Sequence, residues 1–118
     1  MVGLESALSV VHAAVVASGQ LDWADVARVL SGKPAEIGSL AGYSTPFAAG
    51  SAANFTLYDP SASRTFATSD LRGKGINSPY LGRELPGRVI ATVHNGRATV
   101  LDGELVDADT VAREALNG

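Results

Sequence analysis

Two histidines, His12 and His94, are the side chains best suited to bind a metal or to transfer a proton near neutral pH. His12 lies between Val11 and Ala13 in an apolar helical pattern, and His94 ends a predicted strand. Neither has a second histidine at the helical or strand spacing that a metal site needs. We therefore interpret both histidines as structural or solvated residues.

Nucleophilic catalysis by a serine would require a base and an acid within reach of its hydroxyl. No Ser-His-Asp arrangement is evident in the sequence, and no serine stands in a nucleophile-elbow motif. The serines in glycine- or proline-rich stretches are Ser44, Ser51, Ser61, Ser63 and Ser78. The sequence therefore predicts no catalytic serine.

Two glycine-containing motifs place charged residues in predicted loops. Gly73-Lys74-Gly75 could wrap an anion with its backbone amides, but it lacks the strand-loop-helix context of a phosphate loop. We interpret it as a flexible loop. Asp102-Gly103-Glu104 brings two carboxylates near a turn, where acid-base chemistry is conceivable. The turn-forming tendency of Asp-Gly is enough to explain Asp102, and exposure to solvent is enough to explain Glu104.

Three arginines, Arg83, Arg88 and Arg97, have the guanidinium geometry to bind a carboxylate through two hydrogen bonds. Such arginines more often pair with nearby acids, here Glu84 or Asp102. Taken by themselves, the residues of this chain assemble no active site. We expect no catalytic, cofactor-binding or metal-binding residues within it.

The bulk composition narrows the class of protein. The chain has 118 residues, no cysteine and a formal net charge of -3. This length is typical of one domain, and the charge argues against nucleic acid or an anionic membrane as a partner. Without cysteines there is no disulfide scaffold and no thiolate metal site. Because neither a signal peptide nor a bilayer-spanning apolar run is present, we expect a cytoplasmic protein.

Asn95-Gly96 is the clearest structural signal, because both residues tolerate the positive φ of a type I′ turn. β-branched runs flank it, Val89–Val93 before and Ala98–Leu101 after, so the sequence predicts a hairpin. The predicted pairs are His94 with Arg97, Val93 with Ala98, Thr92 with Thr99, Ala91 with Val100 and Ile90 with Leu101. Since neither face is strongly polar, we expect the hairpin to be covered on both sides or to lie within a larger sheet.

Three short helices are predicted before residue 42: Leu4–Gly19, a second from Asp22 to Gly32, and Pro34–Leu40. Gly19 suits a left-handed C-terminal cap, Asp22 an N-terminal cap, and Gly32 a stop. Gly42 closes the third helix. Trp23 is interpreted as a core anchor.

The first helix has an apolar stripe formed by Leu4, Leu8, Val11 and Val15. Ser6 and Ser9 fall on the opposite face. That face carries few charges, so we expect this helix to make contacts on more than one side.

Beyond a connector at 43–51, the pattern changes to alternation. Ala53–Asp59 is predicted to be a strand that Asp59-Pro60 ends, and Arg64–Phe66 a short second strand. The loop from Ser69 to Pro86 is long for a small domain, so it is either functional or packed against something absent from the chain. Asp109–Leu116 is predicted to be a terminal helix. The predicted organisation is a helical segment at 1–42, a β segment at 43–107 and a tail or short helix at 108–118.

Several motifs follow one another in an order that resembles the C-terminal end of bacterial dihydroorotases, members of the amidohydrolase superfamily. These motifs are Met1–Leu8, Gly32–Ala35, Gly50–Asp59, Ser78–Gly82, Leu85–Val89 and Asn95–Arg97. Hydantoinases and allantoinases share similar single pieces. The ordered set is more specific, especially the Gly-Leu-Glu start and the Pro-Tyr-Leu-Gly to Pro-Gly-Arg segment.

The resemblance implies a zinc enzyme that interconverts N-carbamoyl-L-aspartate and dihydroorotate in pyrimidine synthesis. Such enzymes are (β/α)8 barrels with a small β-domain assembled from both ends of the chain. Their metal ligands are a His-x-His pair, a carboxylated lysine, two further histidines and an aspartate. None has a counterpart here. The sequence contains no His-x-His, and its only lysines, Lys33 and Lys74, fall in predicted loops and not on a barrel strand. The last metal-binding aspartate of the family would lie just before the position of Met1.

By this resemblance the fold is α+β and belongs to a C-terminal fragment that is itself inactive. Leu4–Gly19 corresponds to the last barrel helix, two further helices follow, and Ala53–Leu105 is part of the small antiparallel β-domain with its C-terminal hairpin. Zinc is expected in the parent enzyme and not in this chain. The family commonly has asparagine before the Pro-Ala of the third helix. Lys33 cannot cap there, which we expect to cost about 1 kcal/mol of helix stability.

Two other hypotheses stay open. The chain is alternatively a non-catalytic scaffold or binding module, of the kind that associates with aspartate carbamoyltransferase, or the tail of a hydantoinase or allantoinase. An in-frame upstream His-x-His would favour the enzyme, and a true start at Met1 would favour the module. The expected partners are the missing N-terminal barrel and a second copy, through an exposed strand edge or an exchanged element.

Overall fold

The computed structural model describes residues 1–43 and 47–106. The chain divides into two compact units that alternate along the sequence. Unit 1 combines Met1–Trp23 with Asp59–Arg88, and unit 2 combines the described residues of Ala24–Tyr58 with those of 89–106. Helices and a sheet together give the predicted α+β class. The predicted boundaries after residues 42 and 107 stay predictions, and the predicted helix Asp109–Leu116 lies outside the described residues.

The first helix, α1, spans Ala7–Val11 and continues as a π-helical turn over His12–Val16. It begins three residues later than the predicted Leu4. Its end is as predicted, because Gly19 has a φ of 75° and its amide donates to the Val16 carbonyl at 2.9 Å. A glycine adopts this left-handed conformation without the steric cost that other residues pay.

Contacts on more than one side of this helix are confirmed, because Leu8, Val11 and Val15 of the apolar stripe are half-buried while two serines of the opposite face are buried. Only the place of Leu4 in the stripe was wrong. Ser6 and Ser9 are buried, whereas Leu4 is 93% exposed. The Ser6 hydroxyl donates to the Gly3 carbonyl at 3.3 Å, so its burial leaves no unpaired donor. Small serine side chains at these positions allow close packing. Leu4 precedes the first helical residue, Ala7, so it does not belong to the apolar face that the spacing predicted.

The second helical segment runs without a break across the predicted stop. It comprises α2 at Trp23–Ala27, a π-helical turn at Arg28–Gly32 and α3 at Lys33–Ile37. Gly32 has a helical φ of -58°, so it does not end a helix. The wider turn lies directly before Pro34, whose ring has no amide to donate and would clash with the carbonyl four residues earlier in a regular α-helix.

Because these segments are continuous, Lys33 does not stand at a free helix N-terminus, and the expected capping cost does not arise. Its Nζ lies 2.7 Å from Glu36 Oε2. The segment ends at Ile37 instead of Leu40. Ser39, with a φ of 53°, is left-handed just after this end, and Gly42 follows with a φ of 85°. The Leu40 amide then donates back to the Ala35 carbonyl at 2.9 Å, which closes the turn.

The strand β1 spans Phe55–Thr65 and passes through Asp59-Pro60, where the sequence predicted its end. The two predicted strands are therefore parts of one. β1 lies at an edge of the sheet, where a residue without an amide proton is tolerated. Asp59 Oδ1 accepts from the Ser61 hydroxyl at 2.7 Å and from its amide at 2.9 Å, and these bonds lower the pKa of the Asp59 carboxyl.

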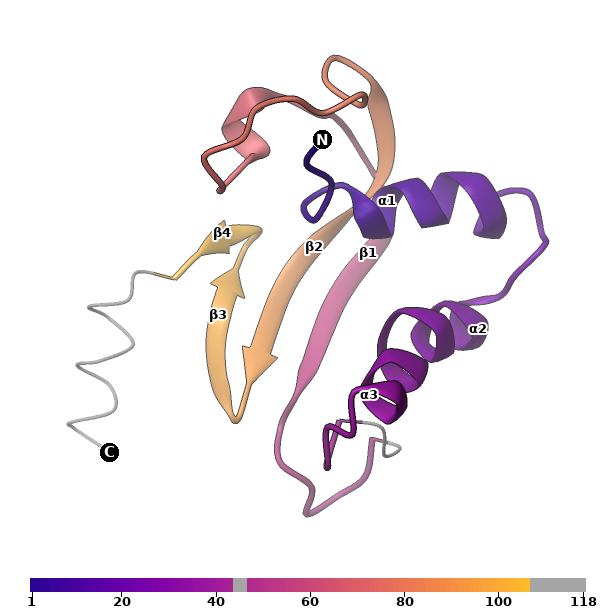
Figure 1. Cartoon of the computed structure of the whole chain (residues 1–118), viewed down its shortest axis with the longest axis vertical. Coiled ribbons are helices and arrows are strands. Elements are labelled where there is room, and N and C mark those ends of the chain that lie inside the picture. Colours follow the sequence, from indigo (N-terminus) through magenta and orange to yellow (C-terminus); the bar gives the residue numbers. More distant parts are fainter. Residues whose placement is uncertain (44–46, 107–118) are drawn as a thin grey trace. The chain divides into compact units, whose positions relative to one another are not determined.

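Within the described residues the strands form one antiparallel sheet in the order β1-β2-β3-β4 (Figure 1). The other strands are β2 at Glu84–His94, β3 at Arg97–Leu101 and β4 at Glu104–Leu105. The predicted hairpin is confirmed, with Asn95 at a φ of 49° and Gly96 at 77°. Asp102-Gly103 repeats this conformation and leads into β4, which the sequence did not predict.

The register of the hairpin is partly as predicted. His94 pairs with Arg97 and Val93 with Ala98, but Thr92 then pairs with Val100 and Ala91 with Leu101. The other three predicted pairs were wrong by one residue because Thr99 forms a β-bulge. Its hydroxyl donates to the Thr92 carbonyl at 3.3 Å, and its own carbonyl accepts from Val106 at 3.0 Å. The bulge moves Leu101 to the face that carries Ala91 and Val93.

Candidate functional site

The region of unit 1 around residues 66–83 is the part of the structure where side chains far apart in the sequence meet. Phe66 lies at its base and is fully buried. The Phe66 amide donates to the Arg83 carbonyl at 2.9 Å, and its carbonyl accepts from Gly82 at 2.8 Å. These reciprocal bonds close the base of the loop and extend the pairing of the strands that lead into it.

An ion pair stabilises the turn at Thr68–Asp70, directly after Phe66 and Ala67. Arg64 Nη1 lies 2.5 Å from Asp70 Oδ1, and the guanidinium lies over the Phe66 ring at 5.3 Å from its centre. The second oxygen of Asp70 accepts from the Ala67 amide at 2.7 Å, which holds the 3-10 turn Thr68–Asp70. Sequence reasoning missed this pair. The turn-forming Thr-Ser-Asp sequence marks Asp70 as a cap, but it does not point to Arg64.

The following residues, which we call the 71–77 loop, pack on the N-terminal segment of the same unit (Figure 1). Glu5 Oε1 accepts from the Arg72 amide at 3.0 Å, and the Val2 amide donates to the Asn77 carbonyl at 3.3 Å. A Cβ on Gly75 would lie 2.7 Å from Val2 Cγ1, so a larger residue there would require the Val2 side chain or the loop to shift.

The backbone amide of Arg72 is the main reason why the pKa of the Glu5 carboxyl is lowered from its ordinary value. A hydrogen bond from the Gly73 amide and the positive charge of Arg72 act in the same direction. The sequence suggested that amides around Gly73-Lys74-Gly75 could surround an anion. The anion held at this loop is a carboxylate of the chain itself.

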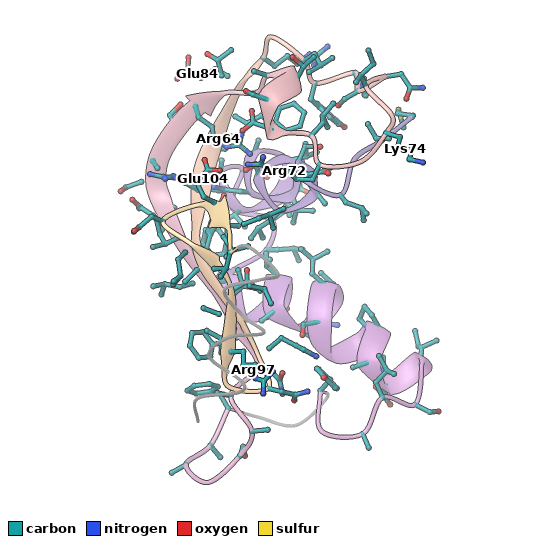
Figure 2. The ribbon with its side chains drawn as sticks, turned by 90° about the vertical axis from the view of Figure 1, so that its left-hand side faces the viewer. Arg64, Arg72, Lys74, Glu84, Arg97 and Glu104 are labelled. Atoms are coloured by element: carbon teal, nitrogen blue, oxygen red, sulfur yellow. The ribbon has the colours of Figure 1, made fainter. Side chains whose placement is uncertain are left out.

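Figure 2 shows Lys74 at the outer bend of this loop, on the side away from Glu84. The Ser69–Pro86 loop was predicted to be either functional or packed against something absent from the chain. Part of it packs against the chain's own N-terminal segment. A glutamate directly before a helix and an amide-rich glycine loop are both visible in the sequence, but nothing in their spacing predicts that they meet.

A second cluster lies in unit 2, at the tip of the β2–β3 hairpin. The Tyr43 ring stacks on His94 at 5.9 Å, with its hydroxyl 3.4 Å from Nδ1, and Asn95 Nδ2 lies 3.4 Å from Nε2. The Asn95 amide donates to Asn54 Oδ1 at 2.8 Å, and the Gly96 amide donates to the Ala53 carbonyl at 2.9 Å. These contacts fit a structural His94 that braces the turn.

His12, in unit 1, contacts the Trp23 ring edge to face, at 5.0 Å between ring centres and 62° between planes. Trp23 is 39% exposed, so its interpretation as a core anchor was wrong. Trp23 thus packs on His12 of the preceding helix at the surface of unit 1. Helical periodicity in the sequence does not tell such a surface contact from a buried one.

The other sequence candidates have ordinary local partners. The Ser63 hydroxyl donates to Glu84 Oε1 at 2.6 Å, Ser61 bonds Asp59, and Ser78 Oγ accepts from the Tyr80 amide at 3.3 Å. Ser51 is exposed, Ser44 lies outside the described residues, and Asp102 belongs to the turn before β4. Glu84, proposed as a partner for an arginine, is thus bonded to a serine.

A surface depression of about 420 Å³ in unit 2 is lined by Arg28, Gly32, Lys33 and Glu36. Its charged side chains are engaged in helical ion pairs, Arg28 with Asp25 at 3.2 Å and Lys33 with Glu36 at 2.7 Å. Such exposed pairs are common on helix surfaces. The depression therefore presents no group aimed at a ligand.

The chain is similar to proteins of known name. It is 60% identical over 113 residues to a dihydroorotase of Leifsonia xyli subsp. xyli, a match that covers 96% of the chain and 26% of that relative. The chain matches the C-terminal portion of dihydroorotases. Dihydroorotases of Streptomyces coelicolor and Mycobacterium tuberculosis are 49% and 42% identical over 105 residues, which is 89% of the chain and 24% of each relative. No family model matches.

The chain thus spans about a quarter of the length of the curated dihydroorotases that it matches. The zinc that this family implies requires a cluster of ligands. Within residues 1–43 and 47–106, no three side chains of the metal-binding types come together. In the same residues, no helix combines the length and hydrophobicity needed to cross a bilayer.

Proposed function

We propose that this chain is the C-terminal portion of a dihydroorotase that interconverts N-carbamoyl-L-aspartate and (S)-dihydroorotate in pyrimidine biosynthesis. The observation that carries the proposal is the 60% identity to a dihydroorotase over 96% of the chain. In this proposal the catalytic and zinc-binding residues belong to the part of the enzyme that precedes the matched region. The chain supplies structural support and no reacting group.

The exposed apolar side chains support such a role. Leu4 in unit 1 and Ile37 and Phe47 in unit 2 are each at least 80% exposed, which is costly for large apolar residues in water. In the proposal α1 is the last helix of a (β/α)8 barrel and the sheet is part of a small β-domain. The N-terminal portion of the enzyme is then the partner that covers these residues. A second copy, joined through the β1 edge or by exchange of an element, is the partner expected when that portion is absent.

The relatives reported above are all named dihydroorotase, which favours this activity over hydrolysis of a hydantoin or of allantoin. A non-catalytic scaffold is the second candidate. It rests on the absence of a ligand cluster among the described residues, and it predicts that the chain binds another protein without contributing to turnover.

A chimera tests the proposal. The C-terminal quarter of the Leifsonia xyli enzyme is replaced by this chain, and dihydroorotate formation is compared with that of the intact enzyme. At 60% identity we expect kcat/KM to stay within about tenfold, equivalent to about 1.4 kcal/mol of transition-state stabilisation.

The matched control is the same chimera with Phe66→Ala, which removes the fully buried ring of unit 1 and should lower the yield of folded, active enzyme. A chimera that is folded and zinc-loaded but lacks turnover would contradict the proposed function and favour the scaffold.

A further inference from the structure

We propose that the 71–77 loop is a detachable clamp on the N-terminal segment, and that the Glu5 carboxylate is the group that holds it closed. This inference concerns a conformational device within the chain and goes beyond the proposed enzymatic function. It rests on the contacts between two segments of unit 1 that lie more than sixty residues apart in the sequence.

Polar contacts dominate the attachment of the loop. The Arg72 amide donates to Glu5 at 3.0 Å, and the Val2 amide donates to Asn77 at 3.3 Å. Of the two large apolar residues of the loop, Leu71 at its start is half-buried, whereas Ile76 near its end is 66% exposed. A segment held by hydrogen bonds near solvent, with little apolar burial, belongs to the part of a protein that opens at low free-energy cost.

Glu5 is the strongest of these contacts because an ionised acceptor makes hydrogen bonds about twice as strong as a neutral one. The other close contact, between Gly75 and Val2, is a fit of shape without a polar bond. Removing the carboxylate therefore removes most of the attachment while leaving the shape of both surfaces intact.

Both ends of the loop are fixed independently of Glu5. The Asp70 carboxylate contacts Arg64 at 2.5 Å before the loop, and Gly82 donates to Phe66 at 2.8 Å after it. Opening is thus confined to the residues between these anchors. It leaves the buried Phe66 and the strand pairing beyond it in place.

The clamp fixes the path of the chain into α1. With the clamp closed, residues 2–5 are tied to the loop at both Val2 and Glu5, directly before the buried Ser6 and the first helical residue, Ala7. With the clamp open, residues 1–5 and the loop are released together. The orientation of whatever precedes α1 therefore depends on a loop far downstream.

Trypsin reports on this opening directly, since it cleaves after Arg72 and Lys74, both inside the loop. The experiment compares cleavage rates at these bonds in the full chain and in its Glu5→Ala variant, with cleavage after Arg28 and Arg97 as internal references. The matched control is Glu36→Ala, which removes a glutamate whose recorded partner is an exposed lysine.

We expect Glu5→Ala to accelerate cleavage after Arg72 and Lys74 about tenfold, as the loss of a charge-assisted hydrogen bond implies. Cleavage at the reference sites should change less than twofold, and Glu36→Ala should leave the loop at the wild-type rate. Hydrogen exchange of the peptides that contain residues 71–77 should rise in parallel, while exchange in β2 and β3 stays unchanged.

A second variant, Gly75→Ala, opens the clamp by another route, because its Cβ would meet Val2 at 2.7 Å while Glu5 is intact. Since both changes release one element, the double variant should be cleaved little faster than the faster single variant. Wild-type cleavage in Glu5→Ala would overturn the proposal. So would fully additive effects, or a uniform acceleration at every site, because Glu5 would then act on the whole fold.

Discussion

The β2–β3 hairpin and the 71–77 loop show two ways in which this chain fixes an irregular segment. In the hairpin, Asn95 and Gly96 adopt positive φ angles and join strands that pair within a few residues. The loop has no such local rule and is held by Glu5 and Val2, from the other end of the sequence. The hairpin therefore depends on local backbone conformation, whereas the loop depends on contacts with residues that are distant in the sequence.

The largest effect is expected at the base of the loop. Phe66→Ala removes a fully buried aromatic ring and should lower the free energy of unfolding by about 3–5 kcal/mol. Leu101→Ala, on the half-exposed face of the hairpin, is the comparison and should cost much less. Urea unfolding measures both. A cost below about 1 kcal/mol for Phe66→Ala would mean that the loop does not depend on a buried anchor.

The next effect concerns the hairpin turn. Gly96→Ala places a Cβ on a residue with a φ of 77°, so it should destabilise the chain by about 1–2 kcal/mol. Gly3→Ala is the matched control, since a Cβ there meets no atom within 4 Å and its φ is not in the left-handed region. Equal unfolding midpoints for the two variants would show that the turn does not need its left-handed conformation.

A stabilising change distinguishes a helical glycine from a turn glycine. Gly32 has a helical φ of -58° and open space around its Cα, so Gly32→Ala should raise the free energy of unfolding by about 0.5–1 kcal/mol. Thermal unfolding followed by circular dichroism measures the change. A decrease in stability would contradict a helical Gly32 and would favour the predicted end of the helix at this residue.

The smallest expected effect is the pH dependence of the clamp. The pKa of Glu5 is lowered in the folded chain, so its stabilising contribution is complete above the pKa of the unfolded chain and is lost as the pH falls through the folded value. NMR titration of the Glu5 carboxyl carbon should give a lower midpoint in the folded chain than in urea. An equal or higher midpoint would argue against the hydrogen bonds from the loop amides.

The sequence predicted those features that depend on one residue's backbone preference. Asn95-Gly96 and Gly19 lie where their tolerance of positive φ is needed. The predictions failed where the surrounding structure outweighed the conformational preference of a single residue. Gly32 stays helical because a continuous segment runs through it, and Pro60 stays in a strand because β1 is an edge. The bulge at Thr99 depends on bonds to Thr92 and Val106 that no alternation pattern encodes.

For the candidate site, the sequence identified the residue types but not their partners. The loop around Gly73 was noted as a set of amides that could hold an anion, yet the anion is Glu5, 67 residues earlier than its first donor. Arg64 and Asp70 were not paired either. Contacts of this range follow from tertiary packing, which periodicity and turn signals do not contain.

We propose that these residues support a catalyst whose reacting groups lie outside them. The most direct test is dihydroorotase turnover by the purified chain itself, supplied with zinc. Our account predicts the rate of buffer alone. Turnover that scales with the concentration of the chain and is abolished by His12→Ala or His94→Ala would contradict it.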